Sequence, residues 1–170
     1  MEKGYKVKNG VFVDHRGTFA PLSLDLLGKA WIQSNVSFND TRGTFRGLHF
    51  QLGEFAQAKL VKVITGNIID FIVDIRPESD EYMKVNIFNV APGEVLMVPR
   101  GYAHGFLTTE DNTVVQYLVD NDYSPESEGS IYWGEFPEIT ETITEFMDGK
   151  LDESLLVISN KDLYTKNFVR

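Results

Sequence analysis

The chain has 170 residues, of which 42% are hydrophobic and 24% charged, and its formal net charge at pH 7 is −9. This length fits one domain spanning 1–170 with a buried core, and the negative charge argues against sequence-independent binding of nucleic acid, which needs clustered cations. Cysteine is absent, which excludes thiolate metal sites and fits a cytoplasmic protein, while a polar start and the lack of any apolar run of ~20 residues argue against a signal peptide and a membrane span.

The N-terminal part predicts short strands and one helix. Gly10–Phe19 indicates two strands around a turn. Leu22–Ala30 is a helix candidate, with Ser23 as a plausible cap. Trp31–Phe38 alternates apolar and polar residues, which predicts a half-buried strand.

Two hairpins are predicted from β-branched runs and turn residues. Leu60–Thr65 and Ile68–Ile75 flank Gly66-Asn67, the pattern of a two-residue hairpin turn. His104–Thr109 and Thr113–Asp120 predict a second hairpin, across residues 110–112.

Further strands are predicted at 84–90, 94–98 and 129–133. The tail, residues 137–170, begins with a weakly helical stretch at Pro137–Phe146, and we expect it to pack on the main domain. Many short strands with only a few short helices indicate an all-β sandwich or barrel.

Cations gather in one eighteen-residue stretch, 42–59, although the chain is acidic. The stretch holds Arg42, Arg46, His49 and Lys59. A companion run, Pro99-Arg-Gly-Tyr-Ala-His-Gly-Phe, follows in the second half. We expect both runs to line one pocket. Alternation puts Arg46 and His49 on opposite faces of a regular strand, so Gly47 is the expected place for a bulge or twist.

The pattern G-x5-P-x-G-x2-H runs from Gly93 to His104. It resembles the second sequence signature of the cupin superfamily, whose members are double-stranded β-helix or jelly-roll barrels. Many cupins use that histidine to bind metal, so a metal-dependent oxygenase is one alternative. Only His49 and the separate His15 could join it, and this shortage of ligands leads us to expect no metal.

A second resemblance covers residues 10–165. It is carried by several motifs in order, namely Arg46-Gly-Leu-His49-Phe-Gln51, Lys59-Leu-Val, Val73-Asp-Ile-Arg76, Ala103-His104-Gly-Phe106, Tyr117 and Tyr123-Ser-Pro125. Together they resemble the dTDP-4-dehydrorhamnose 3,5-epimerase family. The family usually carries an acidic residue where this chain has Pro21, which leaves the nucleotide carrier open.

The resemblance implies a role for each matching position. His49 corresponds to the catalytic base, Asp162 to the carboxylate that orients it, Lys59 to the lysine facing the substrate carbonyl, and Tyr117 to the acid on the opposite face of the sugar. The implied substrate-binding residues are Arg16, Gln33, Asn35, Arg46, His104 and Tyr123. The family also implies a homodimer.

The chemistry of epimerisation next to a ketone suits these residue types. Removing the proton requires a base, and histidine has an unperturbed pKa of ~6.5. A carboxylate on its far nitrogen fixes the tautomer. A lysine ammonium stabilises the enolate oxygen, and a tyrosine can return a proton from the other side. The scheme requires no metal or organic cofactor.

The sequence therefore predicts a cofactor-independent epimerase that acts at C3 and C5 of a nucleotide-linked 4-keto-6-deoxy sugar. A single-carbon epimerase and a 3,4-ketoisomerase are open alternatives within the same chemistry. A non-catalytic sugar-binding jelly roll is a further alternative.

Overall fold

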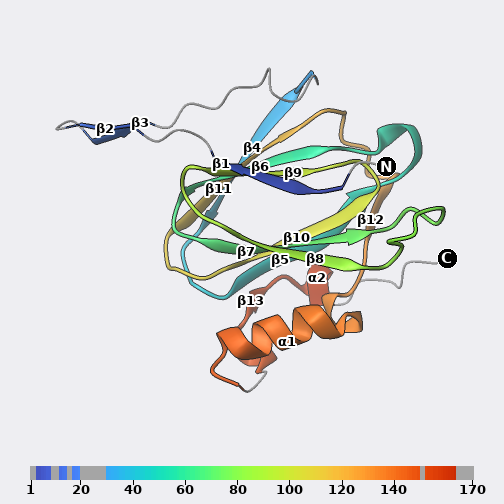
Figure 1. The fold of residues 1–170 in the computed structure, drawn as a ribbon. Coiled ribbons are helices and arrows are strands. Elements are labelled where there is room, and N and C mark those ends of the chain that lie inside the picture. The colour runs from blue at the N-terminus through green and yellow to red at the C-terminus, as the bar shows by residue number, and fades with distance from the viewer. Residues whose placement is uncertain (1–2, 9–11, 15–16, 20–29, 150–151, 164–170) are drawn as a thin grey trace.

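Two mainly antiparallel sheets face each other in the computed structural model of the protein, and helix α1 lies against one of them (Figure 1). The structure describes residues 3–8, 12–14, 17–19, 30–149 and 152–163. The five-stranded sheet has the order β1 (Tyr5–Lys8), β9 (Glu94–Val98), β6 (Lys59–Thr65), β11 (Thr113–Val119) and β4 (Gln33–Asn39). The six-stranded sheet has the order β12 (Glu128–Ser130), β5 (Thr44–Gln51), β10 (Tyr102–Thr108), β7 (Ile68–Asp74) and β8 (Val85–Val90), with β13 (Val157–Ile158) paired to β5.

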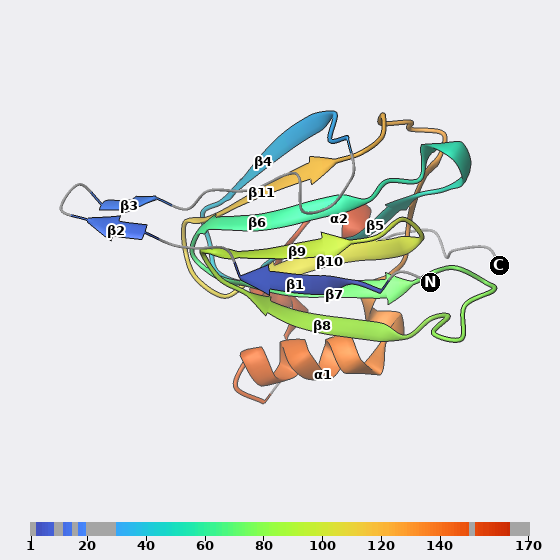
Figure 2. The ribbon, with the colours of Figure 1, turned by 45° about the horizontal axis from the view of Figure 1, so that its top comes forward.

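The remaining elements are short. A two-stranded sheet of β2 (Phe12–Asp14) and β3 (Gly17–Phe19) lies apart from the two main sheets (Figure 2). The helices are η2 (Gly53–Phe55), η3 (Trp133–Glu135), α1 (Pro137–Phe146), η4 (Glu153–Leu155) and α2 (Asn160–Leu163). The predicted helix at 22–30 falls almost entirely outside the described residues. Among the described helices, none is long and apolar enough to cross a membrane.

Both predicted hairpins are wrong, although their strands exist. β6 and β7 are joined across Gly66-Asn67 but belong to different sheets, and the same is true of β10 and β11. The two connections instead lie together, since the Thr109 N–H donates to the Asn67 carbonyl over 2.9 Å. Successive strands that alternate between facing sheets form a jelly roll, so the predicted all-β jelly-roll barrel is confirmed.

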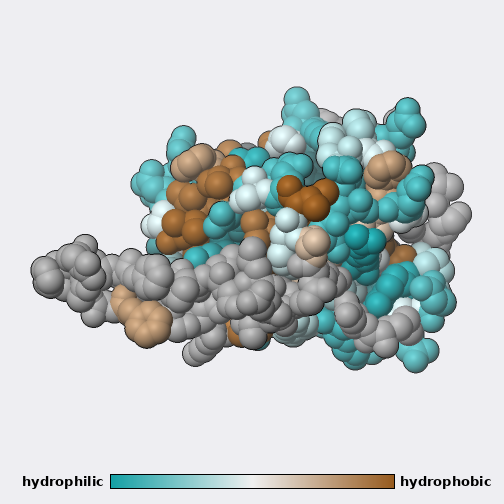
Figure 3. Space-filling view, turned by 90° about the horizontal axis from the view of Figure 1, so that it is seen from above, coloured by the Kyte–Doolittle hydropathy of each residue, from teal (hydrophilic) through white to brown (hydrophobic). Residues whose placement is uncertain are grey.

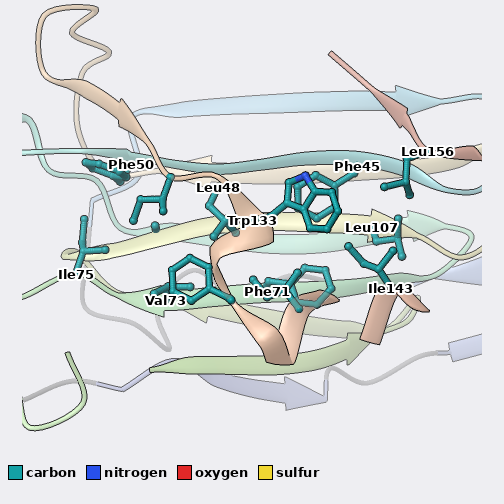
Figure 4. Close-up of a cluster of buried hydrophobic side chains, with 14 residues drawn as sticks. Phe45, Leu48, Phe50, Phe71, Val73, Ile75, Leu107, Trp133, Ile143 and Leu156 are labelled. Carbon is teal, nitrogen blue, oxygen red and sulfur yellow. The ribbon is translucent and has the colours of Figure 1, made fainter. Parts of the chain in front are cut away.

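The core has two layers because β7 is buried on both faces. Ile68 and Ile72 lie in the cluster between the sheets, and Phe71 and Val73 lie in the cluster on the outer side. The outer cluster brings β7 together with Trp133 and other buried residues of the C-terminal part (Figure 4). Burial on both faces explains the nearly continuous apolar sequence of this strand.

Helix α1 completes the outer layer, as the weakly helical pattern at 137–146 predicts. Pro137 occupies the first turn, where the missing N–H costs nothing. Ile139 and Ile143, four residues apart, are fully buried against the sheet.

Candidate active site

His49 and Asp162 form a hydrogen-bonded pair, although 113 residues separate them. His49 lies on β5 and Asp162 on α2, and His49 Nε2 lies 2.8 Å from Asp162 Oδ1. The other carboxylate oxygen accepts the Gly47 N–H over 3.2 Å. Burial alone would raise the pKa of Asp162, but these hydrogen bonds and the charge of His49 bring it below the ordinary value. The ionised carboxylate holds the imidazole proton on Nε2, which leaves Nδ1 of the neutral ring as the basic nitrogen.

Lys59 reaches the same place from the opposite sheet. It begins β6, and its Nζ donates to the His49 carbonyl oxygen over 3.4 Å. Burial lowers the pKa of Lys59 to about 8, although the negative charges of Asp70 and Glu128 oppose this shift. A lysine at this position carries its charge at neutral pH and loses it in mildly basic solution.

Tyr117 lies on β11, next to β6 in the same sheet. Burial raises the pKa of Tyr117, and the charge of Arg46 only partly offsets this. The phenol therefore keeps its proton throughout the neutral range. Arg46 is itself held by Asn39, whose Oδ1 accepts from Arg46 Nε over 2.8 Å.

The strand carrying His49 is irregular at Gly47, as the sequence predicts. The register between β5 and β10 shifts between His104 and Phe106, and Gly47 has a φ of 134°. A Cβ on Gly47 would lie 2.5 Å from the Gly105 Cα, so the two backbones approach at a distance that excludes any side chain. The irregularity lets Arg46 and His49 line the same hollow.

A second histidine–carboxylate pair lies deeper between the sheets. His104 Nε2 lies 2.8 Å from Asp70 Oδ2, and both side chains are buried. Burial raises the pKa of Asp70, and the charges of His104 and Lys59 only partly oppose this. Sequence reasoning named His104 but missed Asp70, because an acidic residue in an apolar strand does not reveal its partner.

These side chains surround two adjoining hollows of about 490 and 260 Å³, which share His49, Lys59 and Tyr117. The larger is lined by Val36, Ser37, Phe38, Arg46, His49, Lys59, His104, Phe106, Tyr117, Ser159, Lys161 and Asp162. The smaller is lined by Gln33, Asn35, His49, Phe50, Gln51, Gln57, Lys59, Tyr117, Val119, Tyr123 and Glu128. Of the catalytic and substrate-binding residues that the resemblance implies, all but Arg16 line one or both hollows; Arg16 lies outside the described residues. Arg42, which was expected at the pocket with the other cations, lines neither hollow, and its guanidinium lies over the Phe146 ring.

Glu128 and Lys161 join the site without having been predicted. Glu128 Oε2 accepts the Tyr123 hydroxyl over 3.1 Å and the Lys161 ammonium over 2.8 Å. These hydrogen bonds, against the opposing effect of burial, lower the pKa of Glu128. Of these two residues, the sequence pointed only to Lys161, because it directly precedes Asp162. Gln33 and Asn35 stand together at the smaller hollow, where Gln33 Nε2 donates to Asn35 Oδ1 over 2.7 Å.

No group of three or more His, Cys, Asp or Glu side chains that could hold a metal ion occurs within the described part of the chain. The two histidines of the site instead each direct Nε2 at a single aspartate.

Comparisons with a family model and with known proteins point to the same family. The sequence model of the dTDP-4-dehydrorhamnose 3,5-epimerase family matches residues 2–169. The dTDP-4-dehydrorhamnose 3,5-epimerase of Salmonella typhimurium is 39% identical over 135 residues, which cover 74% of this chain and 73% of that protein. Its counterpart in Methanothermobacter thermautotrophicus is 37% identical over 162 residues, covering 89% and 82%.

A solved structure agrees with the sequence relatives. The crystal structure of dTDP-4-dehydrorhamnose 3,5-epimerase from Bacillus anthracis, with TDP and PPi bound, superposes with a TM-score of 0.82 at 31% identity. The match covers 97% of this chain and 94% of that chain. The predicted resemblance is thus confirmed, and the chain belongs to the dTDP-4-dehydrorhamnose 3,5-epimerase family.

Proposed function

We propose that the protein is an isomerase that epimerises C3 and C5 of dTDP-4-dehydro-6-deoxyglucose, by removing and returning protons next to the C4 ketone. The observation that carries this proposal is the convergence of one base, one cation and one phenol on the same space. His49, backed by Asp162, comes from one sheet, and Lys59 and Tyr117 come from the other. Membership of the epimerase family supports the same reaction.

In this proposal His49 removes the proton at each carbon. Asp162 fixes the imidazole tautomer and stabilises the imidazolium that forms. A positioned base of this kind contributes about 100- to 10,000-fold to the rate.

Lys59 and Tyr117 complete the reaction. Proton removal sends the electron pair to the C4 oxygen, where the Lys59 ammonium stabilises the negative charge. Inversion needs the new proton to arrive from the other face. We assign Tyr117, on the strand next to that of Lys59, as the proton donor at C5, and solvent water as the proton source at C3. Its raised pKa keeps the hydroxyl protonated and ready to donate.

The remaining polar residues hold the substrate. Arg46 and His104 line the larger hollow, and Gln33, Asn35 and Tyr123 line the smaller. We assign them to sugar and nucleotide contacts, together with Arg16. The TDP bound to the Bacillus anthracis relative supports a thymidine diphosphate carrier.

Deuterium incorporation tests the reaction directly. The protein is incubated with the same substrate, dTDP-4-dehydro-6-deoxyglucose, in heavy water, and NMR locates the deuterium. Label at both C3 and C5 supports the proposal. Label at one carbon would indicate a single-carbon epimerase, transfer of the keto group to C3 would indicate a ketoisomerase, and no label at either carbon would refute the proposal for this substrate.

We also propose that the protein is a homodimer. β4 is an edge strand of the five-stranded sheet, and the exposed fractions of its Val36 and Phe38 are 50% and 71%. The view from above has exposed hydrophobic surface among hydrophilic residues (Figure 3). An exposed apolar edge is commonly covered by a second subunit. Sedimentation that finds only monomer at micromolar concentration would contradict this.

Two further proposals concern the domain organisation of the protein and its location in the cell. We infer a single jelly-roll domain over 1–170 with the tail from 137 packed on it, supported by the burial of Ile139, Ile143 and Leu156 in the outer cluster. A cytoplasmic location stays a prediction, which fractionation of cells that produce the protein would check.

A further inference from the structure

Gln51 ends β5 with a buried side-chain amide that lies beside Tyr123. The Ser124 N–H donates to the Gln51 side-chain oxygen over 2.7 Å, and Gln51 Nε2 donates to the Asp122 carbonyl over 3.0 Å. These are the peptide groups immediately after and before Tyr123. The amide therefore pairs with the backbone on both sides of Tyr123, as a residue of a neighbouring strand would.

The second N–H of the amide is also used. Gln51 Nε2 donates to the Phe55 carbonyl over 2.8 Å, in the short η2 turn that precedes β6. Two carbonyls thus face the nitrogen and one N–H faces the oxygen, which fixes the orientation of the amide. Only a glutamine supplies two donors and one acceptor at this length, so neither glutamate nor methionine can replace it.

Tyr123 is held from its other end as well. Its hydroxyl donates to Glu128 Oε2, and Glu128 stands opposite Gln51 in the pairing of β12 with β5. Tyr123 lines the smaller hollow although 57% of its surface is exposed. An exposed tyrosine at the end of a loop is ordinarily free to turn, and here its backbone and hydroxyl are both restrained.

We propose that Gln51 is a positioning residue for substrate binding. It fixes the backbone of Tyr123 so that the phenol ring forms one wall of the smaller hollow, where the nucleotide end of the substrate binds. This inference rests on the proposed function. Gln51 acts through Tyr123, and its loss weakens binding while the proton-transfer groups stay in place.

The first test measures the positioning itself and needs no substrate. NMR hydrogen exchange is recorded for the Ser124 amide in the wild type and in Gln51→Met. The expected result is exchange faster by about fivefold or more, because a hydrogen bond of ~1 kcal/mol or more is lost. The control is Gln116→Met, which removes a strand glutamine whose side chain donates to Ser34 and lies outside both hollows. Unchanged Ser124 exchange in Gln51→Met would overturn the inference.

The second test is a double-mutant cycle on the Kd for dTDP. We expect Gln51→Met and Tyr123→Ala each to raise the Kd about tenfold, and the double variant to lie within about threefold of Tyr123→Ala. The KM should rise in the same way while kcat for deuterium incorporation stays within about threefold of the wild type. Effects that multiply to about 100-fold would overturn the inference, because Gln51 would then act independently of Tyr123.

The two failures can be told apart. A wild-type protein that neither binds dTDP nor incorporates deuterium contradicts the proposed function, and Ser124 exchange still decides whether Gln51 restrains Tyr123. If Gln51→Met does not fold, Gln51→Glu takes its place in the double-mutant cycle alone, because it loses both donors but keeps the acceptor for Ser124, so Ser124 exchange would not report on it. For Gln51→Glu the expected signal is a rise in Kd that largely disappears when Tyr123→Ala is already present, and a rise that persists in full beside Tyr123→Ala would overturn the inference.

Discussion

The substitution Asp162→Asn tests whether the carboxylate beside His49 decides which ring nitrogen carries the proton. One oxygen accepts from His49 Nε2 over 2.8 Å and the other from the Gly47 N–H over 3.2 Å. Asparagine has the same shape but only one acceptor oxygen. If that oxygen keeps the Gly47 N–H, the NH2 group faces His49. The imidazole must then accept at Nε2 and carry its proton on Nδ1, so the nitrogen that should act as base is blocked.

The size of the effect follows from two independent considerations. A positioned general base contributes about 100- to 10,000-fold to the rate. A hydrogen bond to a charged group is worth about 1.5–3 kcal/mol, which corresponds to about 10- to 150-fold in the stability of the imidazolium. Both ranges contain 100-fold, and we expect kcat for deuterium incorporation to fall by about that factor or more.

The assay is deuterium incorporation at C3 and C5 at saturating substrate, with thermal unfolding as the check that the variant is folded. Asp152→Asn is the matched control, since Asp152 lies in the same C-terminal segment and its carboxylate accepts from Ser154. It should retain the wild-type rate. A folded Asp162→Asn protein with a rate within about threefold of the wild type would refute the reasoning, because tautomer control would then contribute nothing.

Three further predictions concern single residues. Since the pKa of Lys59 is about 8, kcat/KM should fall about tenfold per pH unit above pH 8. This fall should vanish in Lys59→Arg, whose guanidinium stays charged. An unchanged fall in Lys59→Arg would show that another group causes it. Tyr117→Phe should lose label at C5 more than at C3 in the heavy-water assay, and equal losses would contradict a C5-specific role. Gly47→Ala, whose Cβ would lie 2.5 Å from Gly105, should lower the free energy of unfolding in urea by about 3 kcal/mol or more. The control Gly53→Ala, with open space around its Cβ, should lower it by about 1 kcal/mol. Similar losses of stability in the two variants would show that the close approach does not matter.

The position of most strands could be read from the chain. β-branched runs and turn residues locate β6, β7, β10 and β11 within a residue or two. Their partners could not be read in this way. A short turn such as Gly66-Asn67 can join two strands of one sheet or two strands of facing sheets, and local sequence is the same in both cases. The hairpin predictions failed for this reason.

The residues of the site also fall into those that the sequence could indicate and those that it could not. The resemblance to one family named His49, Lys59, Tyr117 and Asp162 from short motifs, and the structure brings them around one space. The alternation of side chains along the strand also predicted the irregularity at Gly47, because a regular strand cannot put Arg46 and His49 in one pocket.

Tertiary structure alone decided the partners that support those residues. Asp70 pairs with His104 across neighbouring strands, and Glu128 joins Tyr123 to Lys161, which lies 33 positions after Glu128 in the sequence. Hydrogen bonds of this kind depend on which strands become neighbours and on which face each side chain points to. The sequence by itself determined the kinds of groups available for the chemistry. Only the packing of the two sheets determined their distances and the pKa values of Lys59 and Asp70, because burial and nearby charge are properties of the folded chain.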